Sequence, residues 1–203
     1  MIRRFAVPLT IAAALALGLP LARLGAVSGT IEGTVKTAGG GPAADAVVFI
    51  EHAAGAPSSP GAATIDQRNM KFAPHVLPIL AGTTVKFLND DAVQHNVFSP
   101  DHEKYNLGTW PQGQTKEHVF AKCAKAPCAY VQLCRIHPEM EGFIVVLDNP
   151  YFAVTNAQGA YKIDNVPPGA YTLGVWAEKG KTAPKPVKID GSRPATLDFA
   201  IGR

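Results

Sequence analysis

The chain has 203 residues, with 19 Lys and Arg, 16 Asp and Glu, and 47% apolar residues. This length accommodates one large domain or two small ones. No run of like charge exceeds three residues, so the composition indicates no basic patch that would bind nucleic acid or an anionic membrane.

The first 28 residues are typical of a secretory signal. The basic segment Met1–Arg4 precedes an apolar run, Phe5–Leu21, which is interrupted by proline and glycine and is too short for a comfortable membrane span. We expect cleavage after Ala26 or Ser28, and an uncleaved anchor is the alternative. Removal takes three of the 19 basic residues, so the mature chain is formally neutral, has no membrane span and is periplasmic or secreted.

Two strands are predicted next. Residues 29–36 alternate as a strand does, residues 37–42 form a Gly-rich turn, and residues 46–51 form a second strand. Residues 53–63 are rich in Ala, Gly, Pro and Ser and are predicted to be a linker.

The middle of the chain continues with strands. Residues 84–89 alternate in polarity, and His95 follows them at a predicted strand end. Residues 131–133 and 143–147 also alternate, so the segment between them is predicted to be a tight loop that joins two strands.

This loop, Cys134–Met140, carries a thiol, an imidazole and a thioether in the pattern Cys-x2-His-x2-Met. These ligand types together suit copper, and a mononuclear site of the His2Cys type with a weak axial Met needs a second imidazole, for which His95 is the candidate. Zinc is the main alternative metal, although structural zinc sites seldom use a thioether.

The other two cysteines, Cys123 and Cys128, lie just before the strand that leads to Cys134. In an exported protein such a pair favours a local disulfide. The alternative is that one of them joins Cys134 in a dinuclear copper centre.

Residues 85–97, together with the Cys-x2-His-x2-Met loop, resemble the cupredoxins, and most of all amicyanin and the plastocyanin-like methylamine utilisation proteins. The resemblance implies one type 1 copper bound by His95, Cys134, His137 and axial Met140. It also implies that the backbone amide of Asn96 donates a hydrogen bond to the Cys134 sulfur. Arg135 departs from the pattern of the relatives, which bears on the redox potential and the docking surface.

A different pattern occupies residues 152–176. Together with residues 29–51 it resembles the carboxypeptidase regulatory-like domain, through the motifs Gly-Thr-x-x-Gly-x-Val, Thr-Asn-Ala-Gln-Gly-Ala-Tyr and Val-Pro-Pro-Gly-Ala-Tyr. The implied fold is all-β, with a cupredoxin Greek-key β-sandwich inserted in a second, smaller transthyretin-like β-sandwich. The implied division is a signal at 1–28, a discontinuous domain at 29–56 and 150–203, and a cupredoxin domain at 62–148.

No Ser-His-Asp order, phosphate loop or paired-carboxylate motif stands out, so we expect no enzyme. The resemblance implies a periplasmic blue copper protein, a monomer that exchanges single electrons transiently with a c-type cytochrome or a dehydrogenase. Pro138, Leu77 and Pro74 are candidates for the docking patch. The alternative is an exported copper-binding protein with a structural, adhesion or copper-supply role.

The remaining histidines are expected to be solvated surface residues, of which His75 lies nearest the predicted copper pole: His52, His75, His102 and His118.

Overall fold

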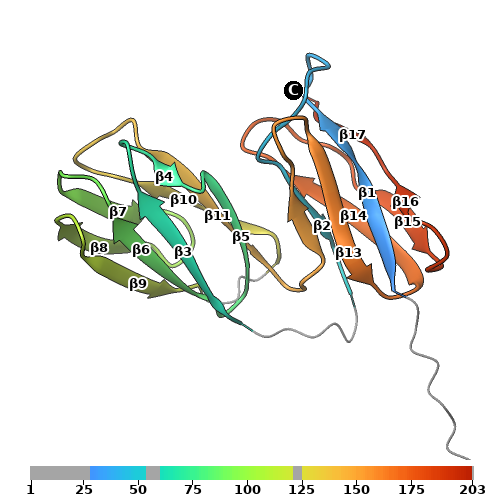
Figure 1. Cartoon of the computed structure of the whole chain (residues 1–203), viewed down its shortest axis with the longest axis horizontal. Helices are drawn as coiled ribbons and strands as arrows, with labels where there is room; N and C mark the ends of the chain where they lie inside the picture. Colours follow the sequence, from blue (N-terminus) through green and yellow to red (C-terminus); the bar gives the residue numbers. More distant parts are fainter. Residues whose placement is uncertain (1–27, 54–59, 121–124, 203) are drawn as a thin grey trace, which may run out of the picture.

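The computed structural model describes residues 28–53, 60–120 and 125–202, and these residues form only strands, turns and loops. Figure 1 shows two β-sandwiches side by side, so the predicted all-β sandwich architecture is confirmed. Within the described residues, no helix is long and apolar enough to span a membrane. The predicted signal, apart from Ser28, lies outside the described residues.

One sandwich, here called the outer sandwich, combines the two ends of the described chain. Its first sheet has the order β13-β1-β16, with β17 also paired to β1, and its second has the order β12-β2-β14-β15. The strands are β1 (Gly29–Lys36), β2 (Val47–Ile50), β12 (Phe152–Val154), β13 (Ala160–Val166), β14 (Gly169–Trp176), β15 (Lys185–Ile189), β16 (Ala195–Thr196) and β17 (Phe199–Ala200). Alternate residues of these strands point inward, and they enclose a core that includes Ile31, Val48, Ile50, Ile163, Leu173 and Phe199.

The other sandwich, here called the inserted sandwich, is formed by the chain between β2 and β12. Its sheets have the orders β5-β11-β10-β7-β8 and β4-β3-β6-β9. The strands are β3 (Ala62–Gln67), β4 (Phe72–Ala73), β5 (Val76–Leu80), β6 (Thr84–Asn89), β7 (His95–Ser99), β8 (Tyr105–Trp110), β9 (Thr115–Val119), β10 (Cys128–Leu133) and β11 (Glu141–Leu147). Its core includes Ile65, Phe87, Trp110, Phe120, Tyr130 and Ile144.

Strand register brings the predicted ligand segments to one end of the inserted sandwich. β10 and β11 are antiparallel and pair as far as Leu133 and Glu141, so the chain from 134 to 140 forms the loop that closes this hairpin. β7 runs antiparallel to β10, with Phe98 opposite Leu133. The start of β7, at His95, therefore lies beside the beginning of the loop.

The two sandwiches also share a third apolar cluster. Val47 and Phe49 of β2 point away from the core of the outer sandwich, because their neighbours Val48 and Ile50 point into it. The outward pair packs with residues of β5 and β11, and all members are largely buried: Val47, Phe49, Val76, Val145 and Leu147. The outer sandwich thus lies against the inserted one instead of being joined to it by linkers alone.

Candidate metal centre

Three of the predicted ligands converge at the end of the inserted sandwich. The Nδ1 atoms of His95 and His137 are 3.0 Å apart, and the Cys134 sulfur lies 4.0 Å and 3.9 Å from them, respectively. Among the described residues, this is the group of His, Cys and acidic side chains whose ligand atoms lie close enough to hold a metal ion. The predicted approach of His95 to the loop is therefore present in the structure.

The size of this triangle fits a metal ion. A point in its plane that is about 2.0 Å from both nitrogens lies about 2.3 Å from the sulfur, and these are the usual lengths of bonds from a zinc ion to imidazole and thiolate. Two nitrogens and one sulfur in a trigonal arrangement suit copper with a weak further ligand. The residues present therefore fit the group that the sequence resemblance implies.

Asp91 fixes the orientation of His95. Its carboxylate accepts a hydrogen bond from His95 Nε2 at 2.8 Å, which leaves Nδ1 without a proton and free to bind a metal. The same carboxylate accepts the backbone amides of Asn69 and Met70 at 2.7 and 2.9 Å. Burial raises the pKa of the Asp91 carboxyl, but the hydrogen bonds from Met70, His95 and Asn69 outweigh it and hold that pKa below its usual range.

The sequence alone did not identify Asp91 as a functional residue. The local signal for its role was its position four residues before His95, at the end of a strand. Asn89 shapes this turn, since its side-chain amide donates to the carbonyls of Val93 and Trp110 and its side-chain oxygen accepts the amide of Asp91.

Asn96 holds the other side of the site. Its backbone amide donates to the Cys134 sulfur at 3.4 Å, which is the contact that the resemblance implies. Its buried side chain donates to Asn106 and to the carbonyl of Gly108, so β7 and β8 keep this amide in place. The backbone amide of Arg135 donates to the Asn96 side-chain oxygen, while the Arg135 guanidinium lies 5.0 Å from the ring centroid of Phe98.

The predicted ligands differ in burial. His95, Cys134 and Met140 are at most 3% exposed, whereas His137 is only partly buried. Met140 belongs to the same buried cluster as Cys134, and its backbone amide donates to the carbonyl of His137. The loop thus buries the thioether residue in the same apolar cluster as the thiol and leaves one imidazole accessible from outside.

Cys123 lies outside the described residues, so the Cys123–Cys128 disulfide stays a prediction. Cys128 opens β10, six residues before Cys134, and Cys134 is a free, buried thiol.

Two of the remaining histidines make specific contacts with other side chains. His118 stacks on Tyr105, with ring centroids 4.0 Å apart, and burial lowers its pKa. His75 lies where the two sandwiches meet and contacts Glu178. His52 and His102 are exposed as expected.

No family model and no curated protein matches the chain. Among solved structures, the chain is similar to a Cu-containing nitrite reductase from Thermus scotoductus SA-01, with 30% identity over 49% of this chain and a TM-score of 0.40. The match spans only about a quarter of the length of that enzyme, 26%. It is also similar to a purple cupredoxin from Nitrosopumilus maritimus, with 30% identity over 41% of this chain and 98% of that one, and a TM-score of 0.36. A mutant of amicyanin in its reduced Cu(I) form has 26% identity over 47% of this chain and 86% of its own, with a TM-score of 0.38.

Proposed function

We propose that this chain is an exported type 1 copper protein that carries single electrons between redox partners and catalyses no reaction of its own. The observation that carries the proposal is the trigonal convergence of His95, Cys134 and His137 at bonding distances from one point. Met140, which belongs to the same buried cluster as Cys134, is the proposed axial ligand.

Copper, when bound, would supply a one-electron couple between Cu(I) and Cu(II). The two states prefer different geometries, so a carrier works fast when its ligands are not free to move. Here Asp91 holds the His95 ring and the amide of Asn96 holds the Cys134 sulfur, while the β10–β11 hairpin closes around the loop. These contacts keep the donor atoms in one arrangement as the charge of the site changes.

Electrons would enter and leave at His137, the ligand that is only partly buried. Ile136, its neighbour in the loop, is 47% exposed, and Val93, two residues before His95, is 46% exposed. A small apolar surface of this kind suits a transient redox encounter, and we propose a c-type cytochrome or a dehydrogenase as the partner of a monomeric carrier. Leu77, a candidate for the docking patch together with Pro138 and Pro74, is partly buried and packs against the core of the inserted sandwich.

The test is the visible spectrum of the copper-loaded protein. We expect an intense charge-transfer band from the Cys134 thiolate, its loss in Cys134→Ser, and a strongly altered band in His137→Gln. His52→Gln removes an exposed histidine of the outer sandwich and should leave the spectrum unchanged. A colourless wild-type protein that binds one copper ion would contradict the proposal.

The alternative function, copper supply, predicts a different response to reduction. An electron carrier retains its metal in both oxidation states, whereas a supply protein releases it to an acceptor. Copper retained after reduction in the presence of a Cu(I) chelator supports the carrier, and rapid transfer to the chelator supports supply.

A further inference from the structure

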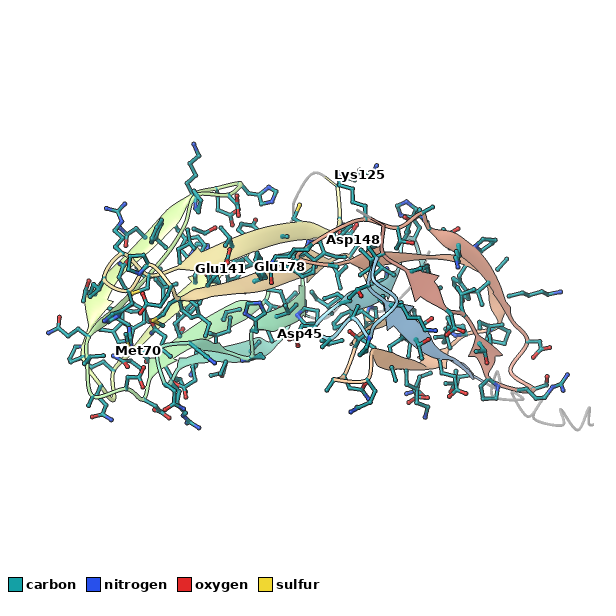
Figure 2. The ribbon with its side chains drawn as sticks, turned by 90° about the horizontal axis from the view of Figure 1, so that it is seen from above. Asp45, Met70, Lys125, Glu141, Asp148 and Glu178 are labelled. Atoms are coloured by element: carbon teal, nitrogen blue, oxygen red, sulfur yellow. The ribbon has the colours of Figure 1, made fainter. Side chains whose placement is uncertain are left out.

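The outer sandwich has no redox group in its described residues, but it touches the chain that leaves the ligand loop. The contact is made by His75, in the turn between β4 and β5. Its Nε2 lies 3.1 Å from a carboxylate oxygen of Glu178, which belongs to the outer sandwich, and its Nδ1 lies 3.2 Å from the carbonyl of Glu141. Both ring nitrogens face oxygen acceptors, so the ring bridges the two sandwiches. In Figure 2 the labelled residues Glu141 and Glu178 lie together at the middle of the molecule.

His75 is fixed to the start of β11 by more than its ring nitrogens. The amide of Phe143 donates to the His75 carbonyl at 2.8 Å, and the two rings meet edge to face with centroids 5.5 Å apart. A Cβ at Gly142 would lie 2.8 Å from Cβ of Phe72 and 3.2 Å from the His75 carbonyl oxygen. The turn at 72–75 therefore lies directly on residues 141–143.

These residues follow Met140 without a break, so whatever fixes Glu141 also limits where Met140 can lie. An axial thioether in a site of this kind forms a long, weak bond, and the potential depends on it. Phe72, in the same turn, also belongs to the buried cluster that contains Cys134 and Met140.

The chain that carries Glu178 is anchored where the two sandwiches meet. Trp176, two residues earlier at the end of β14, packs on Phe143 with ring centroids 5.3 Å apart, and Lys179 pairs with the Glu178 carboxylate at 3.3 Å. The hydrogen bond from His75 is the main cause that holds the pKa of Glu178 below its usual range, with Lys179 adding to it. Since the side chains of His75 and Glu178 are 38% and 33% exposed, solvent screens the pair and we expect it to add little stability. We therefore expect the pair to act by fixing the position of the His75 ring.

We propose that Glu178 is a positioning residue for the metal centre: it holds His75 against Glu141 and so sets the place of Met140. The outer sandwich thereby tunes a site to which it contributes no ligand. This inference rests on the proposed function for its effect on the potential, but the effect on the loop exists without metal.

The experiment uses the full chain and substitutions that separate the charge of the Glu178 side chain from its distance to His75. Glu178→Asp keeps the charge but withdraws the carboxylate by one methylene, whereas Glu178→Gln removes the charge and keeps an acceptor at the same reach. Glu32→Asp, in β1 on the other sheet of the outer sandwich, is the matched control. Two quantities are measured: amide hydrogen exchange of Met140 and Phe143 in the metal-free protein, and the reduction potential and visible spectrum of the copper form.

We expect Glu178→Asp to speed exchange at Met140 and Phe143 several-fold, and to shift the potential and the ratio of absorption bands beyond the scatter of the control. Glu178→Gln should change these quantities less, and thermal unfolding should barely respond in either variant. His75→Phe, which keeps a ring against Phe143 but loses both polar contacts, should reproduce the Glu178→Asp effects.

Unchanged exchange at both amides in Glu178→Asp and His75→Phe would overturn the proposal. If the exchange rates and the potential change in Glu178→Gln but not in Glu178→Asp, the proposal is also overturned, because the site then responds to the charge of residue 178 and not to the position of its side chain. If the copper form is colourless, the proposed function fails, while exchange in the metal-free protein still decides whether Glu178 positions the loop.

Discussion

Asp91 determines the orientation of the His95 ring, and so which ring nitrogen faces the metal site. One carboxylate serves three donors, of which Asn69 N binds one oxygen while Met70 N and His95 Nε2 share the other. Such a carboxylate–imidazole pair fixes the ring tautomer and raises the basicity of the ligand nitrogen, and its loss commonly lowers metal affinity by about 10- to 100-fold. The side chain is 15% exposed, so water replaces it poorly.

We therefore expect Asp91→Asn to weaken metal binding by about 10- to 100-fold, because an amide cannot accept three N–H groups as the carboxylate does. Asp90→Asn is the control, since the neighbouring side chain is 45% exposed and pairs with Arg68 on the surface. Competition with a chelator, for zinc as well as copper, measures the difference. Equal affinities in the two variants would show that Asp91 supports the turn and not the ligand.

Among the strands, β1 is the one on which the outer sandwich depends. It pairs antiparallel with β13 and parallel with both β16 and β17, so it joins the beginning of the described chain to its end. Gly33, in the middle of β1, allows this approach, because a Cβ there would lie 2.1 Å from the backbone oxygen of Leu197. The backbone between β16 and β17 would have to move to admit a side chain.

Gly33→Ala should consequently destabilise the protein by about 1–3 kcal/mol, the usual range for overpacking a close contact. In the matched variant Gly39→Ala the new methyl group meets nothing closer than Thr37 Oγ1 at 3.9 Å, and stability should hardly change. Denaturant unfolding of the two variants provides the comparison. A Gly33→Ala protein as stable as Gly39→Ala would mean that the segment at 197 shifts without cost.

The elements and the ligand loop could be predicted because their signals are local. Polarity alternates along residues 84–89 and 143–147, and Cys-x2-His-x2-Met lies within seven residues. The contacts missed were those between distant residues. His75 and Glu178 are 103 positions apart, and nothing near either one predicts the other. The parallel pairing of β16 and β17 with β1 could not be predicted either, because two-residue strands carry no periodicity.

The molecule as a whole is two sandwiches with separate cores that share one apolar junction. The core of the outer sandwich is built from residues on both sides of the insertion, including Ile31, Val48 and Leu173. On the other face of β2, Val47 and Phe49 are at most 5% exposed because β5 and β11 cover them. Removal of the inserted sandwich would therefore leave the core of the outer sandwich intact but uncover the other face of β2.

Excision of the segment from Ala62 to Asp148, with the gap bridged, tests this division. We expect a folded β protein, since its own core is intact, but one that self-associates because Val47, Phe49 and Trp176 become exposed. Exposing a buried side chain such as Phe49 costs about 1.5–3 kcal/mol, so thermal unfolding should also occur at a lower temperature than in the full chain. Circular dichroism and sedimentation provide the measurements.

Val47→Thr with Phe49→Thr in the excised chain should restore a monomer without loss of the β spectrum, because threonine keeps strand propensity on a face that is now solvated. An excised chain that is unfolded, alongside an isolated 62–148 segment that is also unfolded, would show that neither sandwich folds without the other and that the junction belongs to a single core.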